Sequence, residues 1–154
     1  MPSLSQCLFV GAIAIGTLLA TQSLAAPADD VRIRVAGLRE MGAAFKAVKD
    51  GLATSSPQTM LIQMSARQLV TSSRDQYKWF PVGSGPQPGL KTRAKSDIWA
   101  DPAKFKQAQD ALAAQAVTFQ ATAATGDVGA IRAQFAKLGQ TCKSCHDDFR
   151  SEEH

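Results

Sequence analysis

The chain has 154 residues, which suits one domain, and its 17 basic and 13 acidic side chains give a net charge of +4. The two kinds of charge are interspersed without a Lys/Arg block, and only 6% of the residues are aromatic. This composition argues against a nucleic-acid-binding protein, which needs a concentrated basic surface.

Residues 1–26 carry no charged side chain and contain an apolar run from Leu8 to Ala20. The run leads into small residues, with an A-x-A-like site at residues 23–25. This pattern predicts a cleaved secretory signal peptide over residues 1–26, although the usual Lys or Arg before the run is missing. The alternative is a membrane anchor, but the run is shorter than the roughly 20 residues that span a bilayer. We therefore expect an exported domain over residues 27–154, with no membrane attachment after cleavage.

Two helices are predicted in the first half of this domain. The first covers roughly residues 28–50, and its inward positions are spaced alternately three and four residues apart, as in a helix bundle. These positions are Val31, Arg34, Leu38, Met41, Phe45, Val48 and Leu52. Ser56-Pro57 is typical of a helix start, so the second helix should open there and run to about residue 76. Its apolar residues are Met60, Leu61, Met64, Leu69 and Val70.

The second half begins with a Gly- and Pro-rich connection over residues 77–99, which holds both tryptophans. A loop of this length in a small domain is usually functional or packed over something. Asp101-Pro102 and Asp127 are expected to begin the third and fourth helices. The inward positions of these two helices are Phe105, Ala108, Leu112, Ala116 and Phe119, then Ile131, Phe135, Leu138, Cys142, Cys145 and Phe149. No alternating strand pattern occurs, so the sequence predicts an all-α, antiparallel four-helix bundle.

The stretch CKSCH at residues 142–146 is the main functional signal. Two thiols one helical turn apart can add to the two vinyl groups of a haem, and the adjoining His146 can then bind the iron as an axial ligand. A tetrahedral zinc site would need a fourth ligand, for which the chain offers only His154. A thioredoxin-like redox pair belongs beside a βαβ unit, and a structural disulfide would need neither His146 nor a core position. The residues therefore favour covalent attachment of one haem c to Cys142 and Cys145.

Four stretches carry a family resemblance: VRIRVAGLREM at 31–41, FPVGS at 80–84, KTRAKSDIW at 91–99 and CKSCHDDFR at 142–150. In this order and spacing they resemble the class II cytochromes c, specifically the cytochrome c′ family. The resemblance implies a left-handed four-helix bundle with haem on the last helix, usually paired into a homodimer through the first two helices. Exported proteins of this family are bacterial, which implies the periplasm.

The resemblance also implies a role for two residues of the first helix. Arg34 would contact a haem propionate, and Leu38, four residues later, would face the iron in the distal pocket. Leucine cannot coordinate iron, so the iron should be five-coordinate and high-spin. Met41 lies about one turn further along and is expected in the core. If Met41 bound the iron instead, the protein would be low-spin.

Several of these roles have alternatives. Arg34 can also be a solvent-reaching arginine at a frayed helix start. Arg150, one turn after His146, should lie on the proximal side, where similar proteins have a basic residue, or else complement the helix C-terminus. Phe80, with Trp79 and Val82, is expected at the haem edge, and Trp99 should pack the loop onto the bundle.

These observations lead to two functional hypotheses and argue against a third. The first is a haem protein that binds small diatomic ligands, chiefly nitric oxide and also carbon monoxide, at an open site beside Leu38, and/or transfers electrons. The alternative is a Met-ligated electron carrier, for which the net charge weakly suggests an acidic redox partner. Enzymatic activity is not expected, because Leu38 supplies no distal base.

Overall fold

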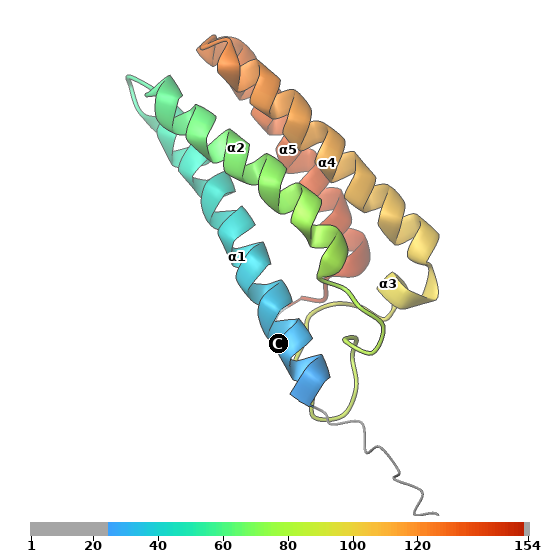
Figure 1. Ribbon diagram of the computed structural model, residues 1–154. Helices are drawn as coiled ribbons and strands as arrows, with labels where there is room; N and C mark the ends of the chain where they lie inside the picture. Colours follow the sequence, from blue (N-terminus) through green and yellow to red (C-terminus); the bar gives the residue numbers. More distant parts are fainter. Residues whose placement is uncertain (1–24, 153–154) are drawn as a thin grey trace, which may run out of the picture.

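The computed structural model, which describes residues 25–152, is a bundle of four long helices (Figure 1). The helices are α1 (Ala25–Ala53), α2 (Thr59–Asp75), α4 (Pro102–Ala124) and α5 (Val128–Phe149). They run alternately up and down, and no strand occurs among the described residues. The predicted all-α, antiparallel four-helix bundle is therefore confirmed.

The long connection between α2 and α4 contains two short helical segments that the sequence did not predict. A 3₁₀ turn, η1 (Gln76–Lys78), continues from the end of α2, and α3 (Asp97–Ala100) precedes α4. The chain between them is irregular and lies across one end of the bundle (Figure 1). This connection therefore covers the end of the bundle where α5 finishes.

The core contains predicted inward positions of all four long helices, together with Ala44, Ile62, Ala66 and Ala123, which were not predicted. Helix α1 packs on α2, α2 on α4, and α4 on α5. The main cluster of buried side chains comprises Met41, Ala44, Val48, Leu52, Ile62, Ala66, Leu69, Leu112, Phe119, Ala123, Ile131 and Leu138. A second cluster, of Ile98, Phe105 and Phe149, lies where the long connection meets α4 and α5. The two clusters place the end of α5 against the connection.

The apolar residues of α2 correct the sequence analysis in one respect. Leu69 and Val70 are buried, but Met60, Leu61 and Met64 are exposed. The helical period explains this, because the buried face of α2 follows Ile62, Ala66 and Leu69, and the other three side chains lie on the opposite face. The first turns of α2 thus present an apolar surface on the outside of the bundle.

The helix starts were predicted correctly at two of three places. Asp101 and Asp127 both cap a helix, and their carboxylates accept backbone N–H groups of Lys104 and Ala130, each at 3.0 Å. The start at Ser56-Pro57 is wrong: α2 begins at Thr59, after Gln58, whose side chain caps nothing. Residues 54–58 are instead used to reverse the chain between α1 and α2.

Residues 25–152 include no helix long and apolar enough to cross a membrane. The expected signal peptide falls on residues 1–26, of which 1–24 lie outside the described residues, as does His154. The signal peptide therefore stays a prediction.

The caps give a test of the fold. Replacing Asp127 by alanine removes the acceptor for the Ala130 N–H group and should lower the free energy of unfolding by about 1 kcal/mol. Gln58→Ala, at a helix start without a side-chain cap, should change it by less than about 0.5 kcal/mol. Chemical denaturation of both variants measures the difference, and equal losses would contradict the assignment of the caps.

Candidate functional site

The CKSCH motif lies in the last two turns of α5. Cys142 packs against the main core cluster, and Cys145 packs against the second cluster with Phe105 and Phe149. Both thiols are partly buried and neither forms a disulfide. Residues three apart share one helix face, so the two sulfur atoms are presented on the same side of α5. The helix therefore offers the paired attachment points that a covalent haem needs.

The surroundings of the two thiols keep them protonated at neutral pH. Burial raises the pKa of Cys142, and burial together with the charges of Cys142 and Asp148 raises the pKa of Cys145 to about 11. A tetrahedral zinc site would need further ligands beside the two thiols. Within residues 25–152 no three or more His, Cys, Asp or Glu side chains are grouped to hold a metal ion. The thiols thus fit thioether formation better than a zinc site.

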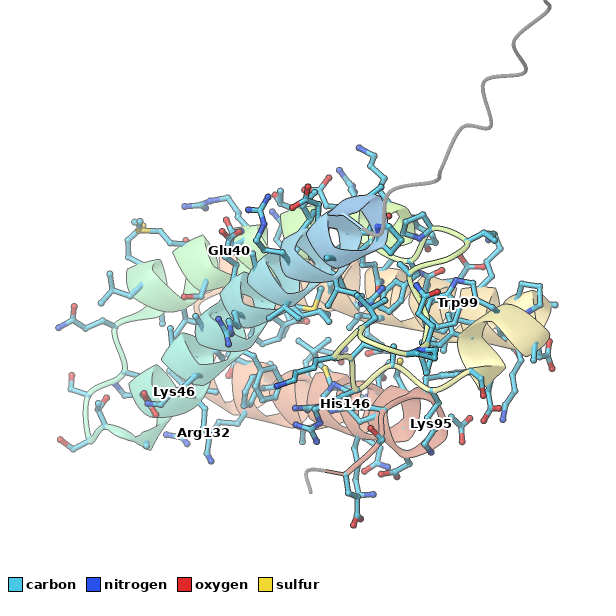
Figure 2. All side chains as sticks on the ribbon, turned by 90° about the horizontal axis from the view of Figure 1, so that it is seen from below. Glu40, Lys46, Lys95, Trp99, Arg132 and His146 are labelled. Atoms are coloured by element: carbon cyan, nitrogen blue, oxygen red, sulfur yellow. The ribbon has the colours of Figure 1, made fainter. Side chains whose placement is uncertain are left out.

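His146 points to the outside of α5, at a cavity of about 350 Å³ beside the C-terminus of the helix (Figure 2). The cavity is lined by Arg93, Lys95, His146, Asp147, Arg150, Ser151 and Glu152. Partial burial and the charge of Arg150 lower the pKa of His146, against the opposing effect of Asp147. A neutral imidazole has a free ring nitrogen, which is the form that binds a metal.

Residues 93–95 of the long connection run beside residues 149–151 and fix the end of α5. Lys95 donates its backbone N–H to the Phe149 carbonyl at 2.9 Å, and Ser151 donates to the Arg93 carbonyl at 2.8 Å. Lys95 also donates its side-chain Nζ to the Asp147 carbonyl at 2.8 Å. These bonds satisfy carbonyls that a helix end leaves open, and they hold the turn that carries His146.

Arg150 lines the same cavity as His146, and its predicted place on the proximal side of a haem stays a prediction. Its side chain is exposed, and its backbone N–H donates to the His146 carbonyl at 3.0 Å. It also follows the last residue of α5, where a positive charge complements the helix dipole. Both proposed roles of Arg150 are compatible with this position.

Arg34 is 2% exposed, which is inconsistent with the solvent-reaching alternative. Its Nη1 donates to Ser84 Oγ at 2.8 Å and to the Trp79 carbonyl at 3.3 Å. Its Nη2 donates to the Ser84 carbonyl and to Thr92 Oγ1, both at 2.9 Å. Burial lowers the pKa of Arg34, and the charge of Asp30 acts in the opposite sense. The guanidinium is thus a buried cation held by the long connection, and its contact with a propionate stays a prediction.

Leu38 is exposed, whereas the other members of the predicted inward row on α1 are buried or, at Phe45, partly buried. Its side chain is 40% exposed, whereas Met41 is 9% exposed and belongs to the main core cluster, as expected. Helices α1 and α5 touch at Phe45 and Phe135, whose ring centroids are 4.4 Å apart. From there they diverge toward Glu40 and His146 (Figure 2). Leu38 therefore lies on the part of α1 that separates from the helix bearing the motif.

The aromatic residues of the connection fill part of this end of the bundle. Phe80 meets Phe105 edge-to-face at 4.8 Å and lies 5.1 Å from the Arg34 guanidinium. Trp99 donates its indole N–H to the Pro81 carbonyl at 3.1 Å and packs against the second cluster, which joins the loop to α4 and α5 as expected. Val82 was expected at the haem edge, but its side chain is 94% exposed and lies at the tip of a turn.

Three further residues of this site were not singled out from the sequence. Ser84 and Thr92 bind Arg34, and Gly37 receives the ring of Trp79, since a Cβ at that glycine would lie 2.2 Å from Trp79 Cζ2. Ser84 and Thr92 fall within the two loop stretches that carry the family resemblance. Their polar partner on α1 is about fifty residues away, so the chain pattern gave no sign of the contact.

The residues present fit a haem c, by the chemistry of the donor set and the shape of the bundle. Two protonated thiols share one face of α5, a histidine follows them, and an apolar side chain lies exposed on the diverging helix. Comparison with known proteins agrees: residues 29–150 match the family described as Cytochrome C′.

Cytochrome c′ of Alcaligenes xylosoxydans is 32% identical over 126 residues, which is 82% of this chain and 96% of that protein. Cytochrome c′ of Rhodopseudomonas palustris is 33% identical over 82% of this chain and 84% of its own length. A nitric oxide complex of a leucine-to-alanine variant of the Alcaligenes xylosoxidans protein has a TM-score of 0.74 at 30% identity, over 82% of this chain and 97% of that one. The chain therefore belongs to the cytochrome c′ family, whose members bind haem c.

The contact between Trp79 and α1 gives a second prediction. Gly37→Ala forces the indole ring away from the helix and should lower the free energy of unfolding by about 1–3 kcal/mol. Gly42→Ala, on the same helix with nothing within 4 Å, should raise it by about 0.5–1 kcal/mol. Thermal unfolding followed by circular dichroism measures both. Stabilisation by both substitutions would show that Trp79 does not pack on Gly37.

Proposed function

We propose that this protein is a periplasmic haem c protein that binds small diatomic ligands, chiefly nitric oxide and carbon monoxide. The observation that carries the proposal is the placing of Leu38 and Met41. Leu38 cannot coordinate iron and lies exposed on the diverging part of α1, whereas the thioether of Met41 is buried in the core. The export that this proposal includes is supported by the sequence of residues 1–26.

The residues proposed to bind the haem lie on two helices, α1 and α5. Cys142 and Cys145 would hold the haem by two thioethers, and His146 would bind its iron. The bound haem would supply an iron that can change its oxidation state and take a diatomic ligand. Leu38 would place an apolar group beside the ligand and exclude water from it. Arg34 is the proposed partner of a propionate, which would share the guanidinium with Ser84 and Thr92.

The apolar character of Leu38 favours some ligands over others. Bound dioxygen is stabilised by a hydrogen-bond donor in the distal pocket, and Leu38 offers none. We therefore expect nitric oxide to bind firmly, carbon monoxide weakly or slowly, and dioxygen without a stable complex. The relatives support this ligand class, since nitric oxide complexes of Alcaligenes xylosoxidans cytochrome c prime are known for several leucine variants and for an arginine-to-lysine variant.

Electron transfer remains part of the proposal as a second role of the same haem. The net charge of +4 suits an acidic redox partner. A low-spin carrier would need Met41 to leave the core cluster, and its 9% exposure argues against that. We propose no enzymatic activity, because Leu38 carries no group that transfers a proton.

Optical spectroscopy of the purified holoprotein tests the function. The dithionite-reduced protein should show a high-spin spectrum that changes on addition of nitric oxide. Leu38→Ala should speed carbon monoxide binding by about tenfold or more, because a smaller side chain opens the face of the iron that Leu38 closes. Met41→Leu, which preserves core volume, should leave the spectrum unchanged. A low-spin spectrum that is indifferent to nitric oxide and is lost in Met41→Leu would refute the proposal.

We also propose that the protein forms a homodimer through α1 and α2. The exposed apolar side chains of Met60, Leu61 and Met64 gather at the start of α2, and Ile33 is exposed on α1 beside the end of α2. A contiguous exposed apolar patch, such as the one at the start of α2, marks a site of protein contact. The sequence resemblance to dimeric proteins points to the same pair of helices.

Charge placed in this surface should break the dimer. Leu61→Asp should shift the protein from dimer to monomer in sedimentation velocity, because it buries an unpaired carboxylate in the contact. Val117→Asp is the matched control, since Val117 is also an exposed apolar residue, 46% against 57% for Leu61, but lies on α4. An unchanged dimer in Leu61→Asp, or a monomeric wild-type protein, would contradict the proposed interface.

A further inference from the structure

The irregular chain over residues 79–96, here called the strap, crosses the end of the bundle where α1 and α5 diverge (Figures 1 and 2). Its first residue contacts α1, because the Trp79 ring lies against Gly37, one residue before Leu38. It ends on α5, where residues 93–95 are bonded to residues 149–151. The strap therefore connects the helix that carries Leu38 with the helix that carries the cysteines.

The α1 end of the strap is held by one buried cation. The four bonds from Arg34 go to three strap residues, Trp79, Ser84 and Thr92. No carboxylate lies within ion-pair distance of Arg34 among residues 25–152. The buried charge is stabilised instead by neutral oxygens and by the faces of Phe80 and Trp99, at 5.1 and 5.9 Å.

The hydroxyl groups of Ser84 and Thr92 that accept from Arg34 are themselves fixed by further hydrogen bonds. Ser84 is fully buried, and its hydroxyl also donates to the Pro81 carbonyl at 2.8 Å. Thr92 Oγ1 accepts a second bond, from the Ala94 N–H at 3.2 Å. Each hydroxyl thus ties the guanidinium to a turn of the strap, so that the strap cannot lift from α1 without breaking hydrogen bonds to a buried charge.

We propose that Arg34, Ser84 and Thr92 form a latch that keeps the strap closed over the diverging end of α1 and α5 and so limits the entry of diatomic ligands to the Leu38 side. Ser84 and Thr92 are then positioning residues, which act through Arg34 and the strap and not on the ligand. The part of this inference that concerns ligand entry rests on the proposed function. The part that concerns the strap does not.

A pair of variants at Thr92 separates the hydroxyl from the rest of the side chain. Thr92→Val removes the acceptor for Arg34 and keeps the shape, whereas Thr92→Ser keeps the acceptor. A lost hydrogen bond to a charged group corresponds to a factor of about ten or more in the population of the open strap. In the holoprotein, hydrogen exchange at the Ser84 and Leu90 amides, which bond within the strap, should therefore be about tenfold faster in Thr92→Val and unchanged in Thr92→Ser.

Ligand entry is measured on the same two proteins. Carbon monoxide recombination after flash photolysis of the ferrous holoprotein should be several-fold faster in Thr92→Val than in Thr92→Ser. Exchange at the Phe119 amide, inside α4, should be the same in both, which shows that the bundle itself is unaffected.

Any other outcome of these experiments contradicts a particular part of the proposal. Unchanged strap exchange in Thr92→Val overturns the latch. Faster strap exchange with unchanged carbon monoxide kinetics overturns the control of ligand entry but leaves the proposed function intact. A holoprotein that takes up neither carbon monoxide nor nitric oxide overturns the proposed function and the control of entry together, while hydrogen exchange still decides the latch. Faster exchange at Phe119 in Thr92→Val would show general destabilisation and would also overturn the latch.

Discussion

The burial of the Arg34 guanidinium is the constraint on which the haem end of this protein depends. A charged group removed from water costs several kcal/mol unless its donors are matched, and here no carboxylate among residues 25–152 pairs with it. The oxygens that match it come from residues 79–92. An irregular segment rich in glycine and proline is thereby fixed against α1, and the aromatic residues it carries are fixed with it.

Helices α1 and α5, which carry the residues of the site, are joined at two places and separated between them. Phe45 and Phe135 join α1 and α5 at one end, and the connection between α2 and α4 joins them at the other. Between these two contacts the thiols of α5 and the apolar side chain of Leu38 belong to separate helices.

The proximal end follows from the way α5 terminates. Carbonyls that a helix leaves open at its C-terminus are satisfied here by residues 93–95, which also bring Arg93 and Lys95 beside His146. Burial and the charges of Arg150 and Arg93 lower the pKa of the imidazole, against the effect of Asp147. The segment that caps α5 through Lys95 thus also contributes, through Arg93, to the electrostatic environment of His146.

The sequence by itself determined the four long helices, the inward faces of α1, α4 and α5, and the chemistry of the motif, because helical periodicity, Asp caps and the spacing of CKSCH are local properties. Local patterns misplaced the start of α2. They also did not separate its exposed face from its buried face, because methionine and leucine are apolar on either face of a helix. Only the tertiary structure decided the partners of Arg34, the contact between the Trp79 ring and Gly37, and the exposure of Leu38 and Val82. The partners of Arg34 and of Gly37 lie about forty to sixty positions further along the chain. Whether the charge of Arg34 can be buried, and whether the indole ring fits, therefore depends on how residues 79–92 fold back over α1.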